Sequence, residues 1–241
     1  MRLSLLLLII ASSAQAAEPV VVKVRDKPPI HYFSNGQPAG PVFELTRRVF
    51  ERAGIPAHYI SVPPKRILAE MQASTERACS ISWYRLPERE AFASFSLPIH
   101  RDPPHLLVAN IEALPRIKAR GLLHAVLHDT SLTLGAVDGV SYGPQLDAAI
   151  AARTGGLERT TVTPVVLAKK VAIGRVDFMF MDQEDFAFLR ETDPATAARL
   201  QALSFPDMPA GQTRHIMCGK AVTDDEMARL DHAIRKLATI K

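Results

Sequence analysis

Short apolar runs alternate along the chain with segments whose apolar residues have the spacing of a helix. Val20 to Val24 is an almost continuous apolar run, which is typical of a strand buried on both faces in a parallel sheet. Pro41 to Ala53 carries its apolar residues on one helical face, and Gly54, a residue that commonly ends a helix, follows it. This alternation continues to the C-terminus and predicts an α/β fold with mainly parallel sheets.

The remaining elements are predicted from the same pattern. Further strands are expected over residues 57–62, 79–83, 105–109, 132–137, 175–182 and 214–219. Further helices are expected over residues 64–71, parts of 114–128, 144–153, 164–173, 183–190 and 194–203, the last of these capped by Asp193. Thr223 to Glu226 has the pattern of a capping box and begins a final amphipathic helix.

The stretch from Ala78 to Pro98 combines a strand end with two arginines. The predicted strand must end at Pro87, because proline removes a ladder donor and restricts the preceding residue. Pro87 also suits the first turn of a short helix. Arg85 and Arg89 therefore follow a strand end, where open α/β sheets place their ligand crevices. An arginine there can grip a carboxylate or phosphate through two parallel hydrogen bonds; the alternative is a solvated surface charge.

This stretch resembles the hallmark of the bacterial family 3 extracellular solute-binding proteins, which have the type II periplasmic binding fold. That hallmark is a strand, a Ser/Thr-rich turn, an arginine at the start of a short helix, and a Phe-Ser-x-Pro run. Arg89 matches the family arginine that clamps the ligand's α-carboxylate, and Phe95 to Pro98 matches the run. The resemblance covers nearly all of the chain after its N-terminal segment.

The resemblance implies two lobes joined by two crossings, each lobe with a mainly parallel sheet. Lobe one is expected to comprise residues 17–102 and 211–241, and lobe two residues 103–210, with the return crossing within 205–212. Ligand is then expected in the interlobe cleft, and closure is a hinge motion driven by contacts to both lobes.

The resemblance also implies roles for individual residues. Ser82 would hold a carboxylate together with Arg89 on lobe one, and Ser141 would join them from lobe two. Asp182 matches the acid that pairs with a ligand's amino group. For both Ser141 and Asp182 the alternative is a helix-capping role with no ligand contact.

Three positions depart from the family pattern. Tyr84 stands where relatives carry a small hydroxyl residue, and beside Arg85 it would narrow the pocket or favour a more acidic ligand. Lys27 and Pro64 stand where relatives commonly carry an aromatic residue. The carboxylate grip is therefore expected here, whereas the identity of the ligand stays open.

Composition and the N-terminus indicate the compartment. The 241 residues are 47% hydrophobic and 22% charged, as in soluble globular proteins. Arg2, an apolar run to Ala11 and the small residues around Ala16 predict a signal peptide over residues 1–16, and hence the periplasm. The run is far shorter than the roughly 20 residues of a membrane-spanning helix, so no membrane insertion is expected after cleavage.

Charge and motif spacing exclude several function classes. The formal charge of +4 comes from interspersed acidic and basic residues, which is not the footprint of a nucleic-acid binder. The glycine spacing around Gly139 and Gly143 matches neither a dinucleotide fingerprint nor a phosphate-cradling loop. His124 and His128 would share a helix face, but they have no third ligand of clear identity nearby. No cofactor and no metal site are predicted.

Two cysteines, Cys79 and Cys218, are present. An export signal would expose them to an oxidising compartment, which is compatible with one disulfide. Sequence does not supply the Cα separation that a bridge requires, and two buried free thiols are the alternative. The resemblance favours the bridge, because the family fold returns the last strand to the lobe that holds the first cysteine.

The expected function is binding rather than chemistry. The resemblance implies a monomeric periplasmic receptor that delivers a small, carboxylate-bearing, amino-acid-like solute to the membrane subunits of an ABC importer. Periplasmic cyclohexadienyl or arogenate dehydratases resemble the same fold, but such an enzyme needs a positioned general acid or base, and no residue here has a spacing that commits it to that role. A third alternative is an orphan binding or sensor protein without a transporter.

Overall fold

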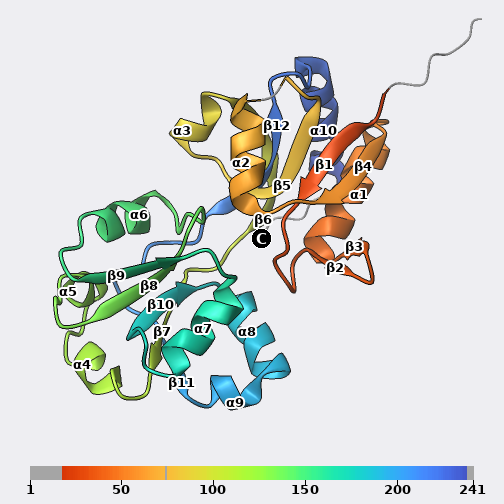
Figure 1. The fold of residues 1–241 in the computed structure, drawn as a ribbon. Coiled ribbons are helices and arrows are strands. Elements are labelled where there is room, and N and C mark those ends of the chain that lie inside the picture. The colour runs from red at the N-terminus through yellow and green to blue at the C-terminus, as the bar shows by residue number, and fades with distance from the viewer. Residues whose placement is uncertain (1–17, 74, 238–241) are drawn as a thin grey trace, which may run out of the picture.

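The computed structural model describes residues 18–73 and 75–237, in which two five-stranded sheets and a two-stranded hairpin are present. Figure 1 shows that each large sheet forms the centre of its own lobe. The strand orders are β4-β1-β5-β12-β6 and β11-β7-β10-β8-β9. The predicted signal peptide, residues 1–16, lies outside the described residues.

The first lobe is built from both ends of the chain. Its sheet consists of β1 (Val20–Val24), β4 (Ala57–Ser61), β5 (Ala78–Tyr84), β6 (Ala93–Arg101) and β12 (Thr213–Gly219). Its helices are α1 (Pro41–Arg52), α2 (Pro64–Ala73), α3 (Pro87–Glu90) and α10 (Asp224–Leu237). The hairpin of β2 (Tyr32–Ser34) and β3 (Gln37–Ala39) lies between β1 and α1 in the sequence.

The second lobe is continuous in sequence. Its sheet consists of β7 (Leu106–Asn110), β8 (Thr133–Val137), β9 (Gly156–Thr160), β10 (Phe178–Met181) and β11 (Leu200–Leu203). Its helices are α4 (Leu114–Lys118), α5 (Leu123–Leu127), α6 (Pro144–Ala151), α7 (Pro164–Ala172), α8 (Gln183–Thr192) and α9 (Pro194–Ala197).

Each large sheet has one reversed strand. In the first lobe β1 pairs in parallel with β4 and β5, and β12 runs antiparallel to both β5 and β6. In the second lobe β8 pairs in parallel with β9 and β10, and β7 runs antiparallel to both β10 and β11. The other strands of each sheet therefore share one direction, and the predicted two-lobed α/β fold with mainly parallel sheets is confirmed.

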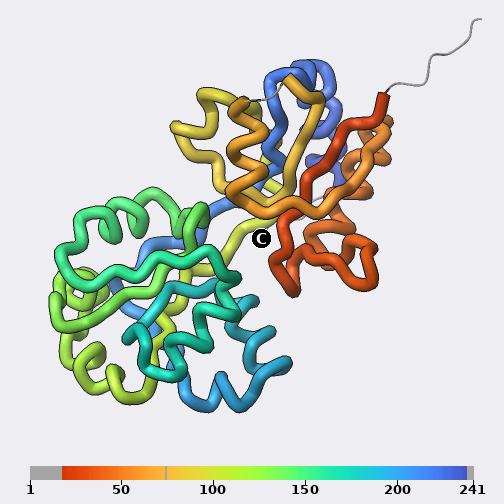
Figure 2. The backbone as a smooth tube through the Cα atoms, viewed as in Figure 1, coloured from red at the N-terminus to blue at the C-terminus, as the bar shows by residue number. Residues whose placement is uncertain are grey.

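Two chain segments connect the lobes and lie side by side (Figure 2). One leads from β6 to β7 and the other from β11 to β12. The amide N–H of Asp102, in the first segment, donates to the carbonyl of Gln212 in the second at 2.9 Å. Gly211 packs so tightly on the first segment that a Cβ atom there would lie 1.7 Å from the carbonyl oxygen of Asp102. A glycine is therefore required where the two backbones meet.

Each lobe has its own apolar core. In the first lobe Val22, Phe50 and Ile81 are buried together with the bridged Cys79 and Cys218. The cysteines stand opposite each other on β5 and β12, with a Cα–Cα distance of 3.9 Å, so the predicted disulfide is present.

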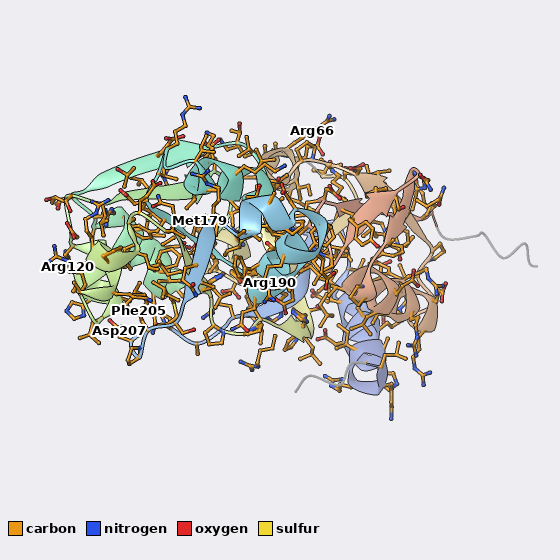
Figure 3. The ribbon with its side chains drawn as sticks, turned by 90° about the horizontal axis from the view of Figure 1, so that it is seen from below. Arg66, Arg120, Met179, Arg190, Phe205 and Asp207 are labelled. Carbon is orange, nitrogen blue, oxygen red and sulfur yellow. A yellow bond between two sulfur atoms is a disulfide. The ribbon has the colours of Figure 1, made fainter. Side chains whose placement is uncertain are left out.

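The apolar cores fill the centre of each lobe, and many charged residues lie at the surface. Met179 on β10 is fully buried within the second lobe, while Arg66 and Arg120 lie on the outside of the two lobes (Figure 3). None of the helices in the described ranges has the length and apolarity that a membrane span needs.

The helix predicted over residues 194–203 is wrong in its second half. Asp193 does cap a helix, since its side chain accepts from the backbone N–H of Thr196 at 3.1 Å, but that helix ends at Ala197. Leu200 to Leu203 instead pairs as an edge strand with β7. Pairing with a neighbouring strand satisfies the backbone and overrides the local helical spacing. The short strands β2, β3 and β9 and the nine-residue strand β6 were not predicted.

Candidate functional site

A cavity of about 220 Å³ lies between the lobes and is lined by residues of both. It is smaller than the roughly 300–1,000 Å³ of pockets for drug-sized ligands, so it suits a small solute. Arg25 directly follows β1, Tyr84 ends β5, and Asp182 directly follows β10. The carboxyl ends of parallel strands from both sheets therefore meet at the cavity, as the general rule for open α/β sheets predicts.

Arg89, on the short helix α3, is a buried arginine that faces the cavity. Its Nη1 donates to the backbone carbonyl of Tyr84 at 3.0 Å, and its guanidinium carbon lies 5.1 Å from the ring centroid of Trp83. In the described part of the chain, no carboxylate lies within ion-pair distance of it. Burial lowers the pKa of Arg89 from its ordinary value, because removal from water disfavours the charged form.

Arg25 is a second buried arginine at the same wall. Its Nη2 donates to the carbonyl of Ser82 at 2.9 Å, and its guanidinium carbon lies 4.9 Å from the Trp83 centroid. Its Nε atom is buried and, among the described residues, has no hydrogen-bond partner. Burial, with the charge of Arg214, lowers the pKa of Arg25 to about 10. A buried donor without a partner is unfavourable.

Trp83 forms a fixed platform beneath both arginines. The indole is almost completely buried, and its Nε1 donates to Ser80 Oγ at 2.7 Å. Ser80 Oγ in turn donates to the carbonyl of Lys23 at 2.6 Å. This chain of hydrogen bonds within the first sheet holds the indole ring in place. The ring therefore gives the guanidinium groups of Arg25 and Arg89 a rigid surface to pack on.

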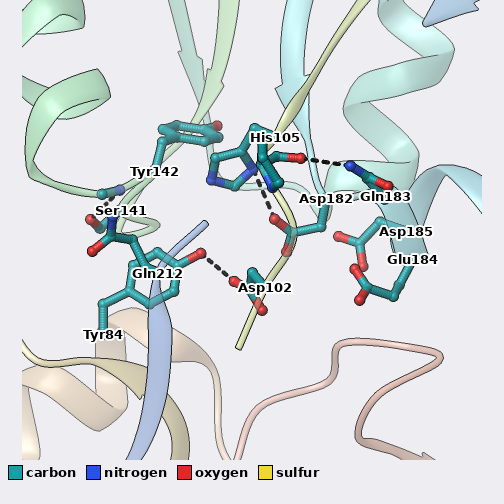
Figure 4. A network of polar contacts seen from close by, with 12 residues as sticks. Tyr84, Asp102, His105, Ser141, Tyr142, Asp182, Gln183, Glu184, Asp185 and Gln212 are labelled. Atoms are coloured by element: carbon teal, nitrogen blue, oxygen red, sulfur yellow. Dashed lines mark hydrogen bonds and ion pairs between the residues drawn. The ribbon is translucent and has the colours of Figure 1, made fainter. Parts of the chain in front are cut away.

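Asp182 of the second lobe contacts His105 (Figure 4) and two cations. Its Oδ2 lies 2.7 Å from Lys27 Nζ and 3.0 Å from Arg214 Nη2, and its Oδ1 lies 2.9 Å from His105 Nδ1. Burial alone would raise the pKa of Asp182, but Lys27, His105 and Arg214 hold it well below its usual range. Asp182 occupies the N-cap position of α8 without a capping hydrogen bond from its side chain, which lies in the cavity wall instead.

Lys27 links the lobes. It extends from the loop after β1, and its Nζ lies 2.7 Å from both carboxylate oxygens of Asp185 as well as from Asp182. At the cavity rim, Lys65 of α2 pairs with Asp138 of the second lobe at 2.9 Å. These ion pairs span the cleft, so the described arrangement is a closed one.

Arg214 and Asp102 form a buried ion pair close to the crossings. Arg214 Nε donates to Asp102 Oδ1 at 2.7 Å, and its Nη2 lies 2.6 Å from Oδ2, which is bidentate geometry. The Tyr84 hydroxyl also donates to Asp102, and the Arg214 guanidinium lies 4.6 Å from the centroid of the Tyr84 ring. Burial raises the pKa of the Tyr84 phenol, so this group stays protonated.

The structure brings four of the sequence-predicted site residues to the cavity wall: Tyr84, Arg89, Ser141 and Asp182. Ser141 Oγ donates to Asp147 and accepts from the N–H of Gly143 at 3.1 Å, so it also supports the turn before α6.

Ser82 and Arg85 are not brought to the cavity wall. Ser82 has a φ of 67°, and within the described chain its buried hydroxyl has no partner; its carbonyl, rather than its side chain, receives Arg25 and Arg214. Arg85 is exposed and pairs with Glu90 at 2.5 Å.

Sequence reasoning missed Arg25, Arg214, Asp102 and His105 as members of the site. Arg25 carried a usable signal, since it directly follows a predicted strand, as Arg85 does. The remaining three lie at or near the crossings. Local sequence patterns do not predict which charged residues come together when the two lobes close.

The chemistry of these groups favours holding an anion over catalysing a reaction. Asp102 and Asp182 contact cations and have lowered pKa values, so they are poorly suited to act as a general base, whereas burial raises the pKa of Asp185, which contacts Lys27. Over residues 18–73 and 75–237 no cluster of three or more metal-ligating side chains is found.

Comparison with known proteins agrees with the fold. The ArtJ protein of Geobacillus stearothermophilus, described as arginine-, lysine- and histidine-binding, superposes with a TM-score of 0.72 at 19% identity, over 91% of this chain and 89% of that one. AbpA of Streptococcus pneumoniae, an amino acid ABC transporter substrate-binding protein bound to L-arginine, superposes with a TM-score of 0.70 at 18% identity, over 91% and 88%. A histidine kinase sensor domain superposes with a TM-score of 0.72 at 19% identity, over 92% of each chain.

A search of curated proteins found no match. The model of the bacterial extracellular solute-binding proteins, family 3, matches residues 20–231, which is most of the sequence. This chain therefore belongs to family 3 of the bacterial extracellular solute-binding proteins.

Proposed function

We propose that the protein is a periplasmic receptor that captures a small, carboxylate-bearing polar solute between its lobes and delivers it to an ABC importer. The observation that carries the proposal is Arg89, a buried arginine in the cavity wall with no carboxylate partner in the described chain. A buried, unpaired cation is unfavourable, and a ligand carboxylate relieves it through charge-assisted hydrogen bonds. Membership of a solute-binding family supports the same conclusion.

In this proposal the lobes divide as the sequence suggests, into residues 17–102 with 211–241 and residues 103–210. Arg89 grips the carboxylate from lobe one, and Ser141 approaches it from lobe two. Closure is a hinge motion about the two crossings, and ligand favours the closed state because it contacts both lobes. The predicted signal peptide, residues 1–16, directs the protein to the periplasm, where it acts as a monomer.

Arg89→Met tests the proposal. Isothermal titration calorimetry against a panel of amino acids and dicarboxylates should first identify a carboxylate ligand of the wild-type protein. The variant should bind that ligand roughly 30-fold more weakly or worse, since removing one partner of a buried charge pair costs about 2–5 kcal/mol.

Arg66→Met is the matched control. Arg66 is an exposed arginine of the same lobe that pairs with Glu70, away from the cavity. The Arg66→Met variant should therefore bind the carboxylate ligand as tightly as the wild type does. Equal binding by Arg89→Met and wild type, with the fold intact by circular dichroism, would rule out the proposed carboxylate grip.

The similarity to a histidine kinase sensor domain makes a sensor the second candidate function. A receptor for an importer should stimulate ATP hydrolysis by its cognate membrane complex in liposomes when ligand is present, whereas a sensor should not. A dehydratase on the same fold, the remaining alternative, would form product from prephenate or arogenate.

A further inference from the structure

The two arginines on Trp83 place unpaired positive charge at one wall of the cavity. Arg25 and Arg89 lie 4.9 and 5.1 Å from the same indole centroid, so the two guanidinium groups are neighbours. Both are buried, and both donate to backbone carbonyls. Neither has a carboxylate at ion-pair distance within the part of the chain that the structure describes.

The buried carboxylates around the cavity are in the opposite situation. Asp182 contacts Lys27, Arg214 and His105; Asp185 contacts Lys27 through both oxygens; and Asp102 contacts Arg214 through both oxygens. Each acid therefore already has a cation supplied by the protein itself. The ammonium of Lys27, which comes from the opposite lobe, lies where two carboxylates converge.

This asymmetry determines which charges a ligand can satisfy. An anionic group entering the cavity meets two cations that lack a counter-charge. An ammonium group entering the cavity can pair with the buried Asp185 only by displacing Lys27, whereas Asp26, which also lines the cavity, is exposed and accepts the N–H of Phe33. The site then discriminates between ligands in two ways: the two arginines attract an anionic group, and Lys27 disfavours an ammonium group.

We propose that the ligand is a small dicarboxylate without an amino group, held by Arg25 and Arg89 over Trp83, and that Lys27 excludes α-amino acids by occupying Asp182 and Asp185. This inference rests on the proposed carboxylate-binding function and specifies its ligand class. It separates this chain from the arginine-binding proteins with which it shares its fold. Lowered pKa values of both arginines agree with two cations that share one buried site.

Pairs of ligands that differ only in an amino group provide the test. The purified protein is titrated by calorimetry with succinate, glutarate and adipate, and with aspartate, glutamate and 2-aminoadipate as their respective amino derivatives. The wild-type protein should bind at least one dicarboxylate about tenfold or more tightly than its amino derivative.

Lys27→Met tests the exclusion. Methionine keeps most of the length of the side chain but removes the ammonium, which takes the cation from Asp185 and leaves Asp182 with Arg214 and His105. In this variant, the ratio of the affinity for the dicarboxylate to the affinity for its amino derivative should fall about tenfold or drop below one. Lys169→Met is the matched control, because Lys169 is an exposed lysine of the second lobe that pairs with Asp193 away from the cavity, and this variant should keep the wild-type preference.

Arg25→Met and Arg25→Lys test the second anion contact. Arg25→Met should weaken dicarboxylate binding about tenfold or more while changing the binding of the corresponding monocarboxylate less than threefold. If Arg25→Met does not fold, as judged by circular dichroism, Arg25→Lys retains the charge without the fork of donors and should still lower dicarboxylate affinity.

The possible results distinguish the inferred dicarboxylate specificity from the proposed carboxylate-binding function on which it rests. If amino derivatives bind the wild type as tightly as the dicarboxylates do, or more tightly, and Arg89→Met removes that binding, the inference is overturned and the proposed function stands. If no carboxylate in the panel binds, both are overturned. An unchanged preference in Lys27→Met overturns the exclusion by Lys27.

Discussion

At the residue scale, Asp102 illustrates how the cleft keeps an acid ionised away from water. It is buried between Arg214 and His100, and it accepts a hydrogen bond from Tyr84. Burial alone would raise its pKa, but His100, whose Nε2 lies 3.3 Å from Oδ1, and the charge of Arg214 hold the pKa at about 2, against an ordinary value of 3.8. Asp182 faces the same arginine from the other lobe, so the pair of acids shares one cation.

This depressed pKa predicts a specific acid sensitivity. Because the folded-state pKa lies below the unfolded one, ionised Asp102 stabilises the fold by about 2 kcal/mol above pH 4, and this contribution is lost as the pH falls through about 2. Urea unfolding of the wild type between pH 5 and pH 2 should show this loss, whereas Asp102→Asn should be less stable at pH 5 and have a flatter profile. Parallel profiles for the two proteins would contradict the prediction.

At the element scale, the pairing of β5 with β12 joins the two parts of the first lobe. Cys79 and Cys218 stand opposite each other on these strands, 139 residues apart in sequence. The whole second lobe lies between them, so the bridge closes a long loop. In the chain-entropy account, such a crosslink restricts the unfolded chain more strongly as the loop lengthens.

The double variant Cys79→Ala/Cys218→Ala should therefore lower the free energy of unfolding by about 2–5 kcal/mol, measured by chemical denaturation. Reduction of the wild type should lower it by a similar amount and should leave the double variant unchanged. A double variant as stable as the oxidised wild type would mean that the sheet pairing alone holds this lobe together.

At the scale of the whole molecule, the contact between the two crossings sets how the lobes meet. Gly211 lies against the backbone of Asp102 and Pro103, and the N–H of Asp102 donates to Gln212. There is no room for a side chain at this contact, so it fixes the distance between the two connections. Hinge motion must pass through these few residues.

Gly211→Ala should force the crossings apart and lower the free energy of unfolding by about 1–3 kcal/mol, as overpacking commonly does. It should also weaken ligand binding, because the two lobes could no longer close in their native alignment. Thermal unfolding and calorimetry measure the two effects. Gly219→Ala is the control, since a Cβ there would meet its nearest atom at an ordinary 3.5 Å. Equal behaviour of the two variants would show that the crossings can separate freely.

The local elements could be predicted because their causes are local. The strand β5, its end at Pro87 and the helix α3 were predicted from apolar spacing and proline stereochemistry. The capping box at Thr223 was also predicted, and in the structure Thr223 and Glu226 bond each other's backbone N–H groups at 3.0 and 3.3 Å. The strand at Leu200 to Leu203 was missed because its pairing partner, β7, lies almost a hundred residues earlier in the sequence.

By itself, the sequence determined the fold class, the order of most elements and the arginine at Arg89, because each of these has a signature within a few neighbouring residues. Only the tertiary structure decided that Arg25 and Arg89 share Trp83, and that Lys27 contacts a carboxylate 158 residues away in the other lobe. The physical reason is that ion pairs across a cleft depend on how two lobes close on each other. That closure is set by the packing of both sheets and their crossings, and no periodicity along the chain records it.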